Sequence, residues 1–188
     1  MVATIVQEAR DNNSLEYTRS CQSRSNIEVE FAWLYYNLTE PRPLVPATPE
    51  DVRKIYDMVM HGEDIGDDAP DGKLFRKGEE AIYRDASTVV HEGLYPESAI
   101  TDAMRKMLLL VNSDDVPKLY SAILGHFIFE YIHPFYDGNG RTGRYLLALW
   151  LREPLSVLTP LSLSRIVLEN KRLKPETCGL GVDPVAQS

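Results

Sequence analysis

The chain of 188 residues has little cysteine and no excess of positive charge. Its two cysteines, Cys21 and Cys178, have no Cys or His neighbour at the spacing of a zinc site. A disulfide framework is not predicted either, because two isolated cysteines are typical of a reducing cytoplasm. The formal net charge of −8 disfavours a nucleic-acid surface and an anionic-membrane surface, since both need basic patches.

Long apolar runs are also missing. Residues 1–8 have neither a basic start nor an apolar core, so no signal peptide is predicted. No apolar stretch reaches the length that spans a bilayer. With 44% hydrophobic and 26% charged residues, the composition is that of a soluble globular domain, and we expect the protein in the cytoplasm.

Hydrophobic residues at helical spacing dominate the chain and predict an all-α, mainly helical fold. Helices are expected over residues 14–38, from Thr48, from Pro96, and over residues 119–132 and 145–151. The last two are apolar on nearly every face, which indicates helices buried in the centre of the domain. Residues 62–73 are acidic and Gly-rich and indicate a loop, with a calcium loop as the alternative.

One small β-hairpin is predicted, from Ala81 to His91. Its strands are expected at 81–84 and 88–91, with a tight turn at 85–87. The predicted architecture is a compact helical bundle that carries this hairpin. It divides into an N-terminal helical segment at 1–46, a main domain at 47–173 and a C-terminal tail at 174–188.

The residues between the two most apolar helices are suited to chemistry. Pro134 stops the first helix at about His133, which leaves an imidazole at a helix end. The following Gly138-Asn139-Gly140 can adopt positive φ and bring backbone N–H groups together. Because these residues open the second helix, the turn is predicted to bind an anion.

Three charged residues complete this loop. Arg141 and Arg144 are expected to project from one side of the first helical turns and to grip phosphate oxygens. Asp137 supplies a carboxylate oxygen, the ligand type that Mg²⁺ prefers. A base, a metal ligand, an anion site and two guanidinium groups form the set that nucleotidyl or phosphoryl transfer needs. Each feature alone is commonly structural, but their contiguity favours the chemical interpretation.

Residues 133–144 resemble the Fic family signature, His-x-Phe-x-(Asp or Glu)-Gly-Asn-Gly-Arg-x-x-Arg, at every specified position. The resemblance extends over about residues 48–170. It implies the Fic fold and a protein adenylyltransferase. Such an enzyme moves AMP from ATP to a Ser, Thr or Tyr hydroxyl of a target protein and releases pyrophosphate.

The resemblance also implies a role for each residue of the loop. His133 is implied as the general base and Asp137 as the holder of Mg²⁺. The nucleotide-binding residues are implied to be Gly138, Asn139 and Gly140 at the α- and β-phosphates, Arg141 on the β-phosphate side, Arg144 at the γ-phosphate and Asn170 at the adenine. Phe135 is implied to point into the core and anchor the loop.

The hairpin from Ala81 to His91 is similar to the family's target-docking flap, which pairs with an extended segment of the target by strand addition. A homo-oligomer is left open as a further partner. Of the other histidines, His126 is expected to be a hydrogen-bonded core residue. His91 is expected to be a surface residue, with contact to the target from the flap as the alternative. After residue 170 the chain departs from the family, because a loop-like tail replaces the Tyr-rich helix that helps close the adenine site.

Other functions remain open. The same loop serves family members that use another donor or that remove AMP. A non-catalytic module that binds a nucleotide or a partner protein is the alternative from a different class. The presence of both His133 and Asp137 favours catalysis over that module.

An inhibitory residue is implied as well. Many Fic proteins carry a helix with Ser or Thr, three variable residues, Glu, and then Gly or Asn, and this Glu pairs with the second arginine of the loop. Ile27-Glu28 is similar to this helix, although Arg24 and Val29 depart from its pattern. Glu30 is the second candidate, and a solvated acid on an amphipathic helix is the alternative for both.

If Glu28 occupies Arg144, then Glu28→Gly frees the guanidinium for the γ-phosphate and raises AMP transfer, including self-modification. Removing a buried carboxylate partner is also expected to lower stability slightly. The measurement is label transfer from α-labelled ATP, with Glu30→Gly as the matched control. An unchanged rate in Glu28→Gly would contradict the inhibitory role.

Overall fold

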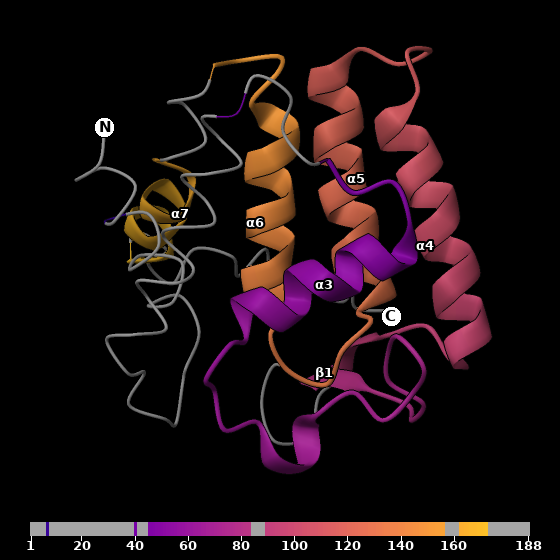
Figure 1. Cartoon of the computed structure of the whole chain (residues 1–188). Coiled ribbons are helices and arrows are strands. Elements are labelled where there is room, and N and C mark those ends of the chain that lie inside the picture. The colour runs from indigo at the N-terminus through magenta and orange to yellow at the C-terminus, as the bar shows by residue number, and fades with distance from the viewer. Residues whose placement is uncertain (1–6, 8–39, 41–44, 84–88, 157–161, 173–188) are drawn as a thin grey trace, which may run out of the picture.

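The computed structural model describes residue 7, residue 40 and residues 45–83, 89–156 and 162–172 (Figure 1). In these residues the chain is mainly helical, which confirms the predicted fold class. The helices are α3 (Pro49–Val59), α4 (Glu97–Asn112), α5 (Lys118–Ile132), α6 (Asn139–Leu151) and α7 (Leu163–Arg172), with a 3₁₀ turn η1 (Gly66–Asp68). The strands are β1 (Ala81–Tyr83) and β2 (Val89–Glu92).

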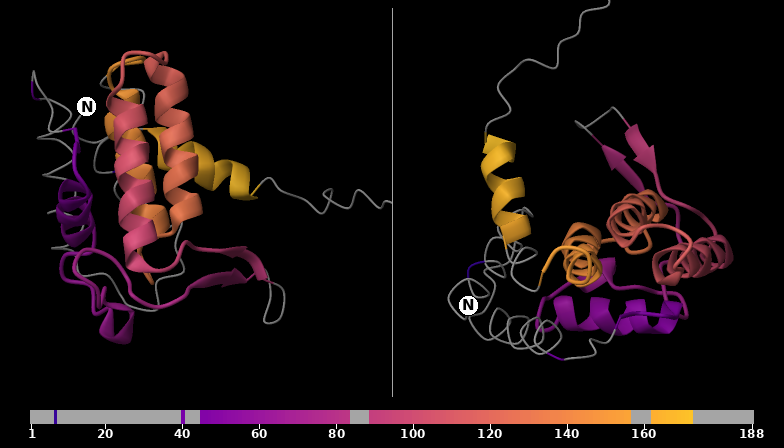
Figure 2. Two further views of the ribbon diagram at one scale, coloured as in Figure 1. Left: turned by 90° about the vertical axis from the view of Figure 1, so that its right-hand side faces the viewer. Right: turned by 90° about the horizontal axis from the view of Figure 1, so that it is seen from above.

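Three helices lie side by side, with α5 between α4 and α6 (Figure 1). Helix α3 crosses them near one end and contacts both α4 and α6, and α7 lies against α6. The C-terminal end of α5 and the N-terminal end of α6 meet at the end of the bundle that α3 crosses (Figure 1). The hairpin projects from this same end (Figure 2).

Local sequence signals explain where these helices begin and end. Thr48 caps α3 through a reciprocal pair of bonds, because its Oγ1 accepts the Asp51 N–H while the Asp51 carboxylate accepts the Thr48 N–H. Helix α4 begins after Pro96, as the sequence predicts. Helix α5 ends at Ile132, because Pro134, two residues later, has no N–H with which to donate a helical hydrogen bond. The acidic segment 62–73 contains only the single turn η1.

The hairpin is antiparallel, and Ala81 pairs with Glu92 and Ile82 with His91. The register then shifts, so that Tyr83 pairs with Val89. Both strands lie where the sequence predicts them, although β2 runs one residue further than expected.

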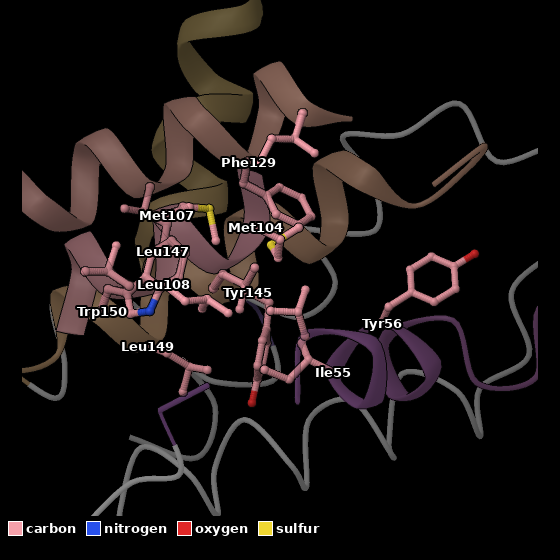
Figure 3. Packing of buried hydrophobic residues seen from close by; sticks show 14 of the residues in the cluster. Ile55, Tyr56, Met104, Met107, Leu108, Phe129, Tyr145, Leu147, Leu149 and Trp150 are labelled. Carbon is pink, nitrogen blue, oxygen red and sulfur yellow. The ribbon is translucent and has the colours of Figure 1, made fainter. Parts of the chain in front are cut away.

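The core lies where α3 meets the three helices that lie side by side, α4, α5 and α6 (Figure 3). It contains aromatic and aliphatic side chains from all four of them, including Ile55, Tyr56, Met104, Met107, Leu108, Phe129, Tyr145, Leu147, Leu149 and Trp150. Helix α6 is buried on every side over its last seven residues, as its apolar sequence predicts.

The prediction that α5 is buried on nearly every face is wrong. Its contacts with the neighbouring helices use mostly small residues, and its buried positions are Ser121, Ala122, Gly125, Phe129 and Ile132. The larger apolar side chains lie on the opposite side and are exposed, namely Tyr120, Ile123, Leu124, Phe127 and Tyr131. The physical reason is that small residues let the helices approach closely, and this turns the bulky side chains away from the core.

Several predicted segments lie outside the described residues. These are the N-terminal helix at 14–38, the hairpin turn at 85–87 and the tail at 174–188. Within the described part of the chain, no helix combines the length and the apolar character needed to cross a membrane.

Two phenylalanines of α5 provide a matched test of this packing. Phe129 is 0% exposed and Phe127 is 67% exposed. We expect Phe129→Ala to lower the free energy of unfolding by about 3–5 kcal/mol, because it leaves a cavity between packed helices. Phe127→Ala should change it by about 0.5 kcal/mol or less. Urea unfolding of both variants measures the difference, and equal losses would contradict the orientation of α5.

Candidate active site

The site is the turn between α5 and α6. His133 caps the C-terminal end of α5 with a left-handed backbone, φ 50° and ψ 64°. Its N–H donates to the Phe129 carbonyl at 3.0 Å, which continues the helical pattern to its last residue. Its side chain is half-buried. The imidazole therefore lies at a helix end, as the sequence predicts.

Phe135 fixes the floor of the turn. Its ring is fully buried and stacks on Tyr56 of α3, with 3.7 Å between ring centroids and 17° between ring planes. Burial raises the pKa of Tyr56 far above its usual value, and the negative charge of Asp137 raises it further. Tyr56 is consequently neutral at physiological pH, and the turn lies on an uncharged aromatic pair.

Asn139 closes the turn. Its side-chain amide donates to the Phe135 carbonyl at 2.7 Å, and its amide oxygen accepts the Phe135 N–H at 3.0 Å. Asn139 is 3% exposed, so its side chain points into the protein. Both polar atoms of this side chain are used within the turn, which leaves the backbone of Asn139 for the predicted phosphate cradle.

Gly138 is required at the start of α6. It is the N-cap residue and has φ 80°, a conformation that residues with a Cβ rarely adopt. A Cβ there would also lie 3.1 Å from Tyr56 Cε2 and overlap the sulfur of Met60. A glycine has no side chain to cap the first N–H groups of the helix, and such a helix start favours an anion.

The two arginines are placed differently from each other. Arg141 is fully buried, and its guanidinium lies 3.1 Å from Glu63 Oε1 and 3.2 Å from Asp137 Oδ2. Arg144 is half-buried. The two arginines therefore differ in exposure, because the Glu63 carboxylate holds Arg141 in the interior. That both grip phosphate oxygens from one side of the helix stays a prediction.

Asp137 lies at the mouth of the turn, and its side chain is 47% exposed. One carboxylate oxygen accepts the Gly138 N–H at 2.6 Å, and the other faces Arg141. The carboxylate is thus fixed in direction by a backbone amide and a buried cation while one side stays accessible.

The structure does not describe the side chains of the remaining predicted site residues. Asn170 lies on α7, and only its backbone is described. Glu28 and its alternative Glu30 lie outside the described residues.

Two of the other histidines, His91 and His126, are near the turn. His126 is half-buried, and its Nδ1 lies 3.1 Å from the Gly143 carbonyl, in agreement with a hydrogen-bonded role. Burial lowers the pKa of His126, which keeps it neutral. His91 is half-buried on β2, with its ring 5.0 Å from that of Tyr131 and 6.5 Å from that of His133.

Two residues of the site are missed by sequence reasoning. Glu63 belongs to an acidic segment that predicts a solvated loop, yet its side chain is 5% exposed beneath Arg141. Arg76 is followed by Lys77 and looks like a surface residue, yet it is 0% exposed and donates to the His133 carbonyl at 2.8 Å. Neither carries a local signal, because the partner of each lies far along the chain.

Asn139→Asp tests how the turn is held. The substitution keeps the acceptor for the Phe135 N–H but places a carboxylate oxygen against the Phe135 carbonyl. We expect a loss of about 1–3 kcal/mol in the free energy of unfolding. Asp102→Asn makes the reverse exchange at an exposed ion pair and should cost less than about 1 kcal/mol. Denaturant unfolding measures both, and a neutral Asn139→Asp would contradict the inward amide.

Comparison with known proteins agrees with this geometry. A crystal structure at 2.70 Å resolution of a Fic family protein from Desulfovibrio desulfuricans G20 matches this chain with a TM-score of 0.64 and 20% sequence identity. The match covers 90% of this chain and 53% of the Desulfovibrio protein, so this chain spans about half of that protein's length. The Fic/DOC family model matches residues 46–151, more than half of the chain, and these residues include the hairpin and the whole turn between α5 and α6. The chain belongs to the Fic/DOC family.

Proposed function

We propose that this protein transfers AMP from ATP to a Ser, Thr or Tyr hydroxyl of a target protein and releases pyrophosphate. The observation that carries the proposal is the turn itself. An imidazole at the end of α5 and a glycine-capped start of α6 lie five residues apart on a turn that Asn139 holds rigidly. A base and an anion site on one rigid support are what attack at a phosphate needs.

In the proposed reaction, His133 accepts the proton of the target hydroxyl. The hydroxyl oxygen then forms a bond to the α-phosphorus of ATP, and the bond from that phosphorus to the bridging oxygen of the β-phosphate breaks. Pyrophosphate leaves with that oxygen, and AMP remains on the target. A histidine suits this step because its ordinary pKa is near neutrality.

The phosphates would lie at the start of α6. The backbone of Gly138, Asn139 and Gly140 opens a helix whose N-terminal dipole favours negative charge. Arg144 is one turn further along the same helix, within reach of a γ-phosphate. Arg141 can serve the β-phosphate only if the nucleotide competes with the carboxylates of Glu63 and Asp137 for its guanidinium.

The fit of Mg²⁺ rests on Asp137. Within the described residues, no group of three or more His, Cys, Asp or Glu side chains could hold a metal ion. A nucleotide-bound Mg²⁺ takes one or two protein carboxylates and completes its shell with phosphate oxygens and water. The accessible side of Asp137 would hold the ion, which supplies charge neutralisation at the α- and β-phosphates.

The target would dock on the hairpin. A two-stranded sheet has two outer edges, and an extended segment can add to such an edge through backbone hydrogen bonds. The β2 strand carries His91 to 6.5 Å from His133, measured between ring centroids. A segment paired with the hairpin would therefore pass near the base.

The proposal is tested by incubating the protein with α-labelled ATP and Mg²⁺ in a cell lysate and identifying the labelled band. His133→Ala should bind ATP normally but lower transfer by about 10²–10⁴-fold, since it removes the base. His61→Ala is the matched control, because His61 is an exposed histidine outside residues 133–144, and it should keep the wild-type rate. Near-normal labelling by His133→Ala would show that His133 is not the base.

The phosphate and metal roles are tested separately. Asp137→Ala should raise the Mg²⁺ concentration needed for turnover, and Arg144→Ala should lower transfer from ATP. Wild-type behaviour of both variants across Mg²⁺ and ATP titrations would contradict the assigned nucleotide site. Loss of label from a labelled target, without new transfer, would identify removal of AMP as the reaction instead.

A further inference from the structure

The end of α5 is joined to the hairpin by its last carbonyl groups. A helix leaves its final carbonyls without partners inside the helix, so other groups must supply the donors. Here the Tyr131 carbonyl lies 2.7 Å from His91 Nε2, and the Ile132 carbonyl accepts the Leu94 N–H at 3.0 Å. Both donors belong to β2 or to the residues that follow it. The hairpin and the residues after it therefore supply hydrogen-bond donors to the last carbonyls of α5, the helix that leads into His133.

Arg76 extends this connection to His133 itself. Its Nε donates to the His133 carbonyl at 2.8 Å, and its Nη2 donates to the Leu94 carbonyl at 2.9 Å. Its Nη1 donates to the Gly78 carbonyl. Gly78 precedes β1 and Leu94 follows β2, so one guanidinium ties both ends of the hairpin to the backbone of His133.

The backbone of Arg76 adds a further bond, because its N–H donates to the Pro134 carbonyl at 3.1 Å. Arg76 thus contacts two successive carbonyls of the turn. His133 has φ 50°, and a residue with a Cβ keeps such a conformation only when its surroundings hold it there. Arg76 holds the two carbonyls that follow this unusual conformation, and the Leu94 N–H holds the Ile132 carbonyl that precedes it.

The charge of Arg76 is buried, yet its side-chain acceptors are backbone carbonyls. Burial lowers the pKa of Arg76, while the nearby Glu80 carboxylate opposes that shift. A guanidinium has five N–H donors in a fixed plane, which allows it to reach three separate carbonyls at once. A lysine ammonium is a compact point charge and cannot bridge the same set.

The segment that presents Arg76 is itself anchored. The Glu97 carboxylate at the start of α4 accepts the N–H groups of Leu74 and Phe75 at 2.7 and 3.0 Å. It also accepts the Lys73 N–H at 3.1 Å. Arg76 therefore extends from a segment that Glu97 fixes to the helical bundle.

Gly93 lies at the same junction. A Cβ on Gly93 would overlap Arg76 Nη2 and would lie 3.0 Å from His133 Cβ. Its N–H donates to the Glu80 carbonyl at 2.9 Å, which extends the hairpin pairing. The strand returning from the hairpin thus passes directly against both Arg76 and His133.

We propose that Arg76 is a positioning residue that locks the backbone of the base His133 to the target-docking hairpin. An extended segment that adds to the hairpin is then held at a fixed distance and orientation from the imidazole. This inference rests on the proposed function for the role of His133, but the mechanical link between Arg76, the hairpin and the turn is independent of activity.

The link is tested by hydrogen exchange and NMR on Arg76→Lys without any substrate. We expect the amides of Gly93 and Leu94 to exchange at least ~10-fold faster than in the wild type, because their neighbours lose the bridging guanidinium. The ring resonances of His133 should shift. Arg53→Lys is the matched control, since Arg53 donates to the Leu74 carbonyl but does not contact the turn. It should leave the Gly93 and Leu94 amides and the His133 ring unchanged.

The catalytic consequence is tested with the target found by lysate labelling. Arg76→Lys should lower kcat by about 10²-fold, since a small displacement of a reacting group has an effect of this size. The KM for ATP should change less than about twofold, because Arg76 does not contact the proposed nucleotide site. Gly93→Ala keeps Arg76, but the added Cβ displaces the guanidinium from the Leu94 and His133 carbonyls. It should therefore lower kcat in the same way.

The outcomes are distinct. Unchanged exchange and unchanged His133 resonances in a folded Arg76→Lys overturn the proposal, as does faster exchange with a normal kcat. If Arg76→Lys does not fold, Gly93→Ala carries both measurements and the same criteria. If the wild type transfers no AMP, the proposed function fails, while the exchange measurement still decides whether Arg76 links the hairpin to the turn.

Discussion

The reciprocal hydrogen bonds between the Asn139 side chain and the backbone of Phe135 are the interaction on which the rest of the site depends. They close the turn between α5 and α6 into a unit of fixed shape. Phe135 is then held against Tyr56, Gly138 takes its left-handed conformation, and α6 begins with its first N–H groups directed at the mouth of the turn. A loop that could open would lose the ring stacking, the Gly138 conformation and the start of α6, because each depends on a fixed distance between Phe135 and Asn139.

Two buried arginines contact this turn, and the protein compensates their charges in different ways. Arg141 faces the carboxylates of Glu63 and Asp137, so its charge is matched by opposite charge. Arg76 faces the carbonyl of His133, at the C-terminal end of α5, where the helix dipole favours a cation, and the carbonyl of Leu94 after β2. A buried charge is costly without partners, and both sets of partners belong to the turn or its neighbours. Rigidity of the turn and burial of these arginines therefore depend on each other.

The orientation of α5 follows from the same close packing. Small residues such as Ala122 and Gly125 face α4 and α6, while Phe127 and Tyr131 face outward. The outward Tyr131 is in ring contact with His91 of the hairpin, and its carbonyl is hydrogen-bonded to the same histidine. The helix that ends in His133 thus packs on the core along one side and supports the hairpin at its end.

The sequence by itself determined the elements whose signals are local. Pro134 ends α5, Thr48 and Asp51 begin α3, and the contiguous residues 133–144 place an imidazole beside a glycine-rich helix start. The family membership was also predictable, because the loop matches the signature without a gap. Only the tertiary structure decided the rest. Which face of α5 is buried could not be predicted from a helix that is apolar on nearly every side, since periodicity then carries no direction. The partners of Arg76 and Arg141 include residues 57 and 78 positions away along the chain, and no local pattern distinguishes a buried arginine from a solvated one when its partners are brought close only by the fold.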